Sequence, residues 1–415
     1  MARPRSRSSR SSKKTSASCC PSRSARRWRR SPHNPSTPAR ARATLAATLV
    51  ISDLHLGNAS GADLLRRDDV RAALFGALEG IERVVLLGDA IELRQVPLRD
   101  ALAVARPFFE QLGAALGAGR EVVLVAGNHD HTLLEPWFER RRRSSAPPPL
   151  GLAEQPTWEP GDVAAQLAGW LAPARLTLAY PGIWLRDDVY ALHGHYLDRH
   201  TTVPTFERLS AGVMGRIVGA VPAGACPDDY ERALAPIYAW SYSLAQQSRA
   251  DGRRARGTQG VSVRVWSALA GDGHRPLRHR ALSTLFPLGI AAINRAGIGP
   301  VRADVSGRAL ETAGTRAMAA ATTALAIPAA HVVFGHTHRA GPRPVDDLAQ
   351  WTTPDGARLH NSGCWVFERQ FLSRTASESP YWPGRAVRVE HDSAAPPQLL
   401  DLLGDRSLDD LSARA

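Results

Sequence analysis

The chain of 415 residues is long enough to form the core of one large domain with insertions, or the cores of two domains. Its composition, with 44% apolar and 22% charged residues, is typical of a globular protein. No uninterrupted apolar stretch approaches the ~18 to 20 residues that span a bilayer, which argues against a transmembrane helix. The formal net charge of +13 suggests nucleic acid as a partner, but residues 1–43 carry all of it, with 11 Arg, 2 Lys and no acidic residue. Removing these 13 from the 52 basic residues leaves 39, which the 39 acidic residues balance.

The basic segment at residues 1–43 is also rich in Ser and Pro, and we expect it to be a disordered tail because it has little apolar surface to bury. Its arginine pairs are not followed by the apolar segment of ~7 to 15 residues that a secretion signal requires. We favour a dispensable extension, with tethering to anionic lipid or nucleic acid as the alternative. Four cysteines without a CxxC pair predict no disulfide framework, and they suit a reducing, cytoplasmic compartment.

The first part of the chain after the tail alternates between two kinds of pattern. Short apolar runs predict buried strands, and apolar residues at helical spacing predict amphipathic helices between them. The predicted strands are 48–51, 84–87 and 122–125, and the predicted helices are 63–81 and 98–116. Strands that alternate with helices indicate a parallel sheet in an α/β fold.

The second part begins with an excursion that we expect to be exposed, in which the run Arg140–Arg143 is interpreted as a solvated face rather than a phosphate clamp. An antiparallel hairpin follows at 175–192. Residues 200–330 contain few strand signals and predict a mostly helical insertion or cap. Closing strands are predicted at 332–334, 359–365 and 386–389. The main domain would therefore comprise 44–199 and 331–405.

Polar side chains follow five of the predicted buried strands directly. They are Asp53 and His55, Asp89, Asn128, His193, and His336 with His338. Because the carboxyl ends of parallel strands meet at one edge of a sheet, these side chains should lie together. On an extended segment, both members of a DxH or HxH pair would point the same way. Oxygen and imidazole donors without thiolate suit two divalent cations such as Mn²⁺, Fe²⁺ or Zn²⁺.

The same stretches form a series of motifs that resembles the calcineurin-like metallophosphoesterase family. The motifs are Asp53-Leu54-His55, Gly88-Asp89, Gly127-Asn128-His129-Asp130, His193-Gly194 and Gly335-His336-Thr337-His338. The resemblance implies a four-layer α/β/β/α sandwich around a dinuclear metal centre. It also implies two sets of ligands that share Asp89, namely Asp53, His55, Asp89 and His338 for one cation, and Asp89, Asn128, His193 and His336 for the other.

The family resemblance further implies hydrolysis of a phosphate ester or pyrophosphate by metal-activated hydroxide. In that scheme His129 contacts the phosphate and protonates the leaving oxygen, and Asp130 orients the His129 ring. His195 either contacts substrate or makes a structural hydrogen bond. Arg94, close to Glu92, stands where a side chain could face either the phosphate or the cap. Cys364 is interpreted as a packed residue rather than a nucleophile.

Two stretches, 52–56 and 88–92, look most like the branch that hydrolyses UDP-2,3-diacylglucosamine, although that branch usually has Arg where His129 stands. We therefore expect a phosphoesterase that acts on a small phosphorylated substrate. The resemblance to this branch implies a substrate linked to a lipid or a nucleotide, and it leaves peripheral membrane contact open. A nuclease or phosphodiesterase acting on nucleic acid is one alternative, against which the neutral body counts. A non-catalytic scaffold is the other, and the full set of donors counts against it.

Overall fold

The computed structural model describes residues 46–222, 224–247, 289–302 and 307–412, and the predicted tail lies outside them. Its strands follow one path of hydrogen-bonded neighbours, β10-β9-β1-β2-β3-β5-β6-β7-β8, with β4 paired to β5. The strand bounds are β1 Ala47–Ile51, β2 Ile81–Leu87, β3 Glu121–Val125, β4 Ala153–Glu154, β5 Arg175–Arg186, β6 Val189–Leu192, β7 His331–Phe334, β8 Arg358–Asn361, β9 Arg385–Glu390 and β10 Gln398–Asp401.

The long strand β5 divides this path into two sheets. Residues 175–179 pair in parallel with β3, beside which β2 and β1 are also parallel. Residues 182–186 pair antiparallel with β6, which is followed by β7 and β8 in parallel. β9 and β10 complete the outer edge of the first sheet in antiparallel pairing. The carboxyl ends of β1, β2, β3, β6 and β7 therefore supply the loops of the site.

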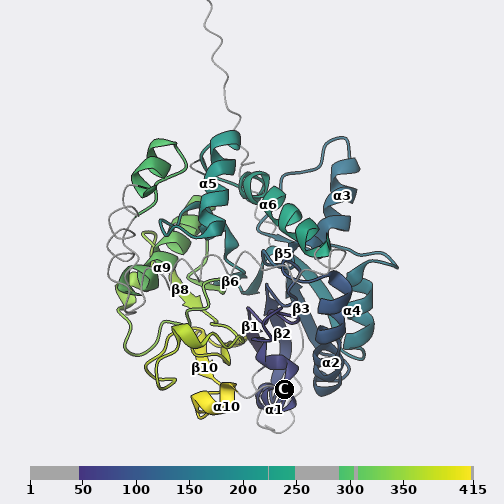
Figure 1. Ribbon diagram of the computed structural model, residues 1–415. Coiled ribbons are helices and arrows are strands. Elements are labelled where there is room, and N and C mark those ends of the chain that lie inside the picture. The colour runs from purple at the N-terminus through teal and green to yellow at the C-terminus, as the bar shows by residue number, and fades with distance from the viewer. Residues whose placement is uncertain (1–45, 223, 248–288, 303–306, 413–415) are drawn as a thin grey trace, which may run out of the picture.

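The alternation of side chains between the two faces of β2 shows how the two sheets pack. Val84 and Leu86 of β2 belong to a core shared with the helices of the first sheet, whereas Val85 and Leu87 belong to a core shared with Val333 of β7. Successive side chains of a strand point to opposite faces, so the second core lies between the two sheets. Layers of helix, sheet, sheet and helix result, which confirms the predicted α/β fold (Figure 1).

Helices cover the outer face of each sheet. α1 Asp68–Gly76, α2 Leu98–Leu116 and α4 Val163–Leu171 pack on the first sheet, and α3 Glu135–Arg143 follows the loop after β3. On the second sheet lie α5 Phe206–Val218, α6 Pro227–Gln247 and α9 Gly307–Ala324, all from the chain between β6 and β7. A short helix, α10 Leu408–Ser412, ends the described chain.

The described helices of the predicted insertion share a core with the second sheet. Tyr230 and Leu234 of α6 and Met318 of α9 pack in one cluster with Tyr190 of β6 and Phe334 of β7. The insertion is thus helical where it is described and rests directly on the sheet that carries two of the donor loops. Residues 248–288 of the predicted insertion lie outside the described residues.

Several predicted elements have different bounds in the structure. The helix predicted at 63–81 spans only Asp68–Gly76, because the Asp63 carboxylate accepts the N–H of Gly57 and holds a separate 3₁₀ turn. Its predicted end, Ile81, begins β2 instead. Arg140–Arg143 form the last turn of α3 rather than a loop, where cations favour a helix C-terminus.

The strand predicted at 359–365 ends at Asn361, and the sequence did not indicate β4 or β10. Both missed strands are short. β10 also lies at an edge of the sheet, where few side chains are buried and the sequence therefore shows no long run of apolar residues. No helix in the part of the chain that the structure describes is both long and apolar enough to cross a membrane.

Candidate metal centre

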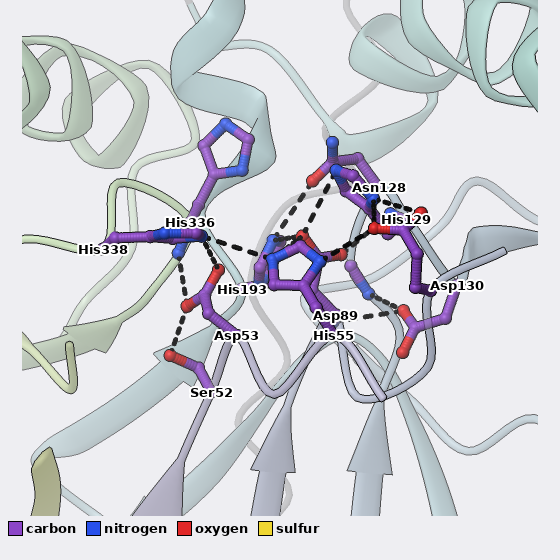
Figure 2. A network of polar contacts seen from close by, with 12 residues as sticks. Ser52, Asp53, His55, Asp89, Asn128, His129, Asp130, His193, His336 and His338 are labelled. Carbon is purple, nitrogen blue, oxygen red and sulfur yellow. Dashed lines mark hydrogen bonds and ion pairs between the residues drawn. The ribbon is translucent and has the colours of Figure 1, made fainter. Parts of the chain in front are cut away.

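The seven predicted donors lie together beyond the carboxyl ends of the strands, as Figure 2 shows. The conformation predicted for the DxH and HxH pairs was wrong, because these segments are not extended. Among the described non-glycine residues, positive φ angles occur at six positions, and five of them are donors: Asp53 (55°), His55 (45°), Asp89 (53°), His336 (65°) and His338 (59°), with Ala326 as the sixth. Left-handed backbone costs of the order of 1 to 3 kcal/mol per residue, and such residues cluster at functional sites.

Backbone hydrogen bonds hold the first two donor loops against each other. The Asp53 N–H donates to the Gly88 carbonyl at 3.1 Å, and the His55 N–H donates to the Asp89 carbonyl at 2.8 Å. Gly88 itself has φ 84°, and a Cβ there would lie 2.3 Å from the His193 ring. Gly88 is therefore required for His193 of the second sheet to approach the Asp89 carboxylate of the first sheet.

The first group of donors comprises Asp53, His55 and His338, whose ligand atoms lie within 4.8 Å of one another. The two imidazole Nε2 atoms are 3.2 Å apart, and His338 Nε2 is 3.4 Å from Asp53 Oδ1. Each ring has an acceptor behind it, because His55 Nδ1 lies 3.1 Å from Glu92 and His338 Nδ1 lies 3.4 Å from Glu368. An acceptor at Nδ1 fixes the tautomer that leaves Nε2 free to bind a cation.

The second group comprises Asp89, His193 and His336. His193 Nδ1 donates to the Leu87 carbonyl at 2.9 Å, so its Nε2, 3.3 Å from Asp89 Oδ2, is the atom that faces the other donors. His336 is held the other way round, with Nε2 3.1 Å from Asp198. Nδ1 is therefore its ligand atom.

The Asn128 amide lies against the second group. One end is 3.1 Å from His336 Nδ1 and 3.2 Å from both His193 Nε2 and Asp89 Oδ2, and the other end is 2.6 Å from Arg94 Nη1. With its oxygen toward Arg94, the NH₂ group meets the three acceptors. With the oxygen turned toward them, four acceptor atoms converge, and only a cation satisfies that arrangement.

Asp53 gives an independent indication that cations fit here. Its side chain is fully buried, and Oδ2 accepts hydrogen bonds from Ser52 Oγ and from the His336 N–H, whereas Oδ1 has no hydrogen-bond partner in the described part of the chain. A buried carboxylate oxygen without a donor costs free energy unless a cation satisfies it. His338 Nε2 faces this oxygen, so the pair has the chemistry of a ligand set.

The chain matches the family model for calcineurin-like phosphoesterases over residues 47–214. This match supports the metallophosphoesterase family for the chain. The matched region contains Asp53, His55, Asp89, Asn128 and His193, and the fold brings His336 and His338 to them from outside it. No curated protein matches the chain in the comparison with characterised sequences. The family match does not single out the branch that acts on UDP-2,3-diacylglucosamine.

His129 lies beside the donors, and the residue that orients it is not the predicted one. Asp130 does not contact the ring: its carboxylate accepts the backbone N–H groups of Gly127 and Ala90, each at 2.7 Å. Glu92 takes the place predicted for Asp130, because both of its oxygens lie within 2.9 Å of His129 Nδ1. Asp130 therefore shapes the loop, and Glu92 holds the rings of both His129 and His55.

Geometry alone does not separate His129 from the ligands. Its Nε2 is 4.0 Å from Asp89 Oδ2, and His55, Asp89 and His129 form a third group compact enough for a cation. The proton-transfer role of His129 in the phosphoesterase therefore rests on the family resemblance.

Neighbouring charges shift the pKa values of several groups in the site. Burial alone would raise the pKa of Asp89, but the imidazoles of His193 and His129 hold it well below its usual range. Burial lowers the pKa of His193, and the Asp89 carboxylate outweighs that effect and raises it to about 9. Burial lowers the pKa of His129 in spite of Glu92. The carboxylates are ionised at neutral pH, which a cation site requires.

The remaining predicted residues lie at the border of the site. His195 is buried, with Nε2 3.4 Å from the Tyr180 hydroxyl, and Arg94 is buried between Asn128 and Glu207 of α5. Cys364 is buried with its thiol toward the Val366 carbonyl.

Four residues of the site escaped sequence reasoning, namely Asp198, Glu231, Tyr238 and Glu368. Asp198 lies five residues after His193 and could have been sought as an acceptor for a ligand histidine. The other three carry no local signal, since their contacts span more than 29 residues of sequence.

Proposed function

We propose that this phosphoesterase is a hydrolase that binds two divalent cations and cleaves a phosphate ester or a pyrophosphate. The observation that carries the proposal is the position of Asp89, whose Oδ2 lies 3.8 Å from His55 Nε2 and 3.3 Å from His193 Nε2. One carboxylate thus lies between two sets of donors. Two dications at short separation repel strongly, and a shared anion lowers that cost.

The donors would hold the cations in the two sets already described, with Asp89 common to both. Mn²⁺, Fe²⁺ and Zn²⁺ all suit oxygen and imidazole ligands. When bound, such ions supply hydroxide at neutral pH and offset negative charge on the phosphate oxygens. The protein's part is to fix the donors, which it does through acceptors behind His55, His193, His336 and His338.

His129 provides the proton for the leaving oxygen in this proposal. Glu92 accepts the hydrogen on Nδ1, so that Nε2 is the atom available to the substrate. A phosphate anion bound beside the ring raises its pKa, opposing the effect of burial, and Glu92 stabilises the resulting imidazolium. The Nε2 proton then passes to the leaving oxygen as the bond to phosphorus breaks, and a neutral imidazole remains.

The proposal is tested by supplying each metal to metal-free protein and measuring hydrolysis of phosphomonoesters, phosphodiesters, nucleotide pyrophosphates and single-stranded DNA. Asp89→Asn should lower kcat/KM by at least about 100-fold and reduce the metal bound per chain, because the change weakens a ligand of both cations. Asp187→Asn, in an exposed turn, is the matched control. Retention of full activity and two metals by Asp89→Asn would refute the bridging role.

His129→Ala separates the proton donor from the ligands. Two metals per chain should remain, and turnover should fall about 10² to 10⁴-fold with an alkyl phosphate but much less with p-nitrophenyl phosphate, whose leaving group needs no proton. His391→Ala, near the outer edge of the first sheet, serves as the control. Loss of metal from His129→Ala would make it a ligand instead.

A further inference from the structure

Four buried polar side chains beside the candidate metal centre each have one atom without a hydrogen-bond partner among the residues that the structure describes. The atoms are Arg94 Nε, His195 Nδ1, Asp198 Oδ2 and the Tyr238 hydroxyl, and none of the four side chains belongs to a residue more than 7% exposed. We call these four residues the Tyr238 cluster. A buried polar atom without a partner destabilises the folded protein, so four of them together call for an explanation.

The Tyr238 cluster adjoins the second group of donors. Arg94 contacts Asn128 through Nη1, and Asp198 holds His336 through Oδ1. The ring of Tyr238 meets that of His195 edge to face, with centroids 5.7 Å apart. Burial raises the pKa of Tyr238 well above its usual range, and the negative charge of Asp198 raises it further. The phenol is therefore protonated, and α6 of the insertion brings it to the edge of the centre.

Hydrogen bonds around Glu231 decide which atoms of the cluster are donors. Tyr180 donates its hydroxyl hydrogen to Glu231 Oε1 at 2.5 Å, and Tyr196 donates to the same oxygen at 2.8 Å. Tyr180 therefore has only a lone pair to offer His195 Nε2 at 3.4 Å. His195 must carry its hydrogen on Nε2, which leaves Nδ1 as an acceptor.

The cluster thus presents two acceptors, His195 Nδ1 and Asp198 Oδ2, together with two donors, Arg94 Nε and the Tyr238 hydroxyl. A phosphate oxygen would satisfy the donors alone and would be repelled by Asp198. An alcohol hydroxyl both donates and accepts, so a group with neighbouring hydroxyls matches the whole set.

We infer that the Tyr238 cluster binds the hydroxyl-bearing part of a polyol or sugar phosphate while the phosphate lies at the candidate metal centre. The inference rests on the proposed function for the position of the phosphate. It assigns substrate recognition to the helical insertion, through Tyr238, and to the loops after β2 and β6, through Arg94, His195 and Asp198 (Figure 1).

The test uses two phosphonates with one carbon skeleton, 3,4-dihydroxybutylphosphonate and butylphosphonate, neither of which can be hydrolysed. Calorimetric titration of Mn²⁺-loaded full-length protein should give a Kd at least about tenfold lower for the dihydroxy compound, as one to two satisfied hydrogen bonds predict. Tyr238→Phe should reduce that preference to less than about threefold without changing the metal bound per chain. Tyr242→Phe, on the same helix but packed against the first core, should keep it.

Equal binding of the two phosphonates by the wild-type protein would overturn the inference and mean that the cluster holds only ordered water. A preference that survives Tyr238→Phe would also overturn it. Failure of the proposed function would look different, because the metal-loaded protein would then hydrolyse none of the esters or pyrophosphates in the activity panel whatever its preference between the phosphonates.

Discussion

The candidate metal centre and the Tyr238 cluster adjoin each other and treat buried polar atoms in opposite ways. In the centre, each of the four imidazole donors uses one ring nitrogen on a protein acceptor and leaves the other free. In the Tyr238 cluster, four atoms have no hydrogen-bond partner within the described ranges of the chain. The difference suggests that the fold orients the donors of the candidate metal centre before substrate binds. The polar atoms of the Tyr238 cluster would obtain their hydrogen-bond partners only from the bound substrate.

Among variants of residues that are neither donors nor His129, Glu92→Gln should have the largest effect, because Glu92 orients rings with two different roles. An amide cannot accept hydrogens from both His55 and His129 as a carboxylate does, and we expect kcat/KM to fall about 100-fold. Glu121→Gln, at the opposite end of β3, is the matched control. An unchanged kcat/KM for Glu92→Gln would contradict the contrast between the candidate metal centre and the Tyr238 cluster, because the rings of His55 and His129 would then need no charged acceptor.

Glu231→Gln tests the link between the insertion and the catalytic loop. Glu231 on α6 accepts contacts from Tyr180, Tyr196 and, at 2.9 Å, His131, which directly follows the Asn-His-Asp motif. The free energy of unfolding in urea should fall by about 1 to 3 kcal/mol, since a buried donor loses its partner. The bound metal should stay the same. Metal loss without a loss of stability would instead show that Glu231 acts on the donors themselves.

Ala326→Gly should have the smallest effect and the opposite sign. Ala326, just beyond α9, has φ 49° and is exposed, so glycine there relieves left-handed strain and should raise the free energy of unfolding by up to about 1 kcal/mol. Ala330→Gly, where the residue has no positive φ, should lower it. If both changes destabilise the protein, left-handed backbone carries no measurable cost here, and strain at the donors would need another explanation.

Much of the fold could be predicted from the sequence because burial leaves a periodic pattern. The buried runs at 48–51, 84–87 and 122–125 all lie in strands, and α2 has the predicted bounds. The seven donors were found for a related reason, since each follows an apolar run that ends at one edge of a sheet. Edge strands such as β10 are only half-buried and gave no such pattern.

The orientation of the site could not be predicted, because it depends on contacts between distant segments. Asp130 is next to His129 in sequence, yet its carboxylate satisfies N–H groups of two loops and turns away from the ring. Glu92 reaches the ring from another strand end, 37 residues away. The positive φ of Asp53 and His55 could not be predicted either, because most Asp and His residues have negative φ, although both types adopt left-handed backbone more often than other non-glycine residues.

The pairing of β6 with β7 bears on how this enzyme family can diversify. The two strands are parallel neighbours, with Tyr190 opposite Val332, and the rings of His193 and His336 at their ends lie 5.2 Å apart although the whole insertion separates them in sequence. The sheet register, and not the length of the intervening chain, keeps these two donors adjacent. Evolution can therefore lengthen or rewrite that segment and acquire a new substrate while the reaction chemistry is inherited unchanged.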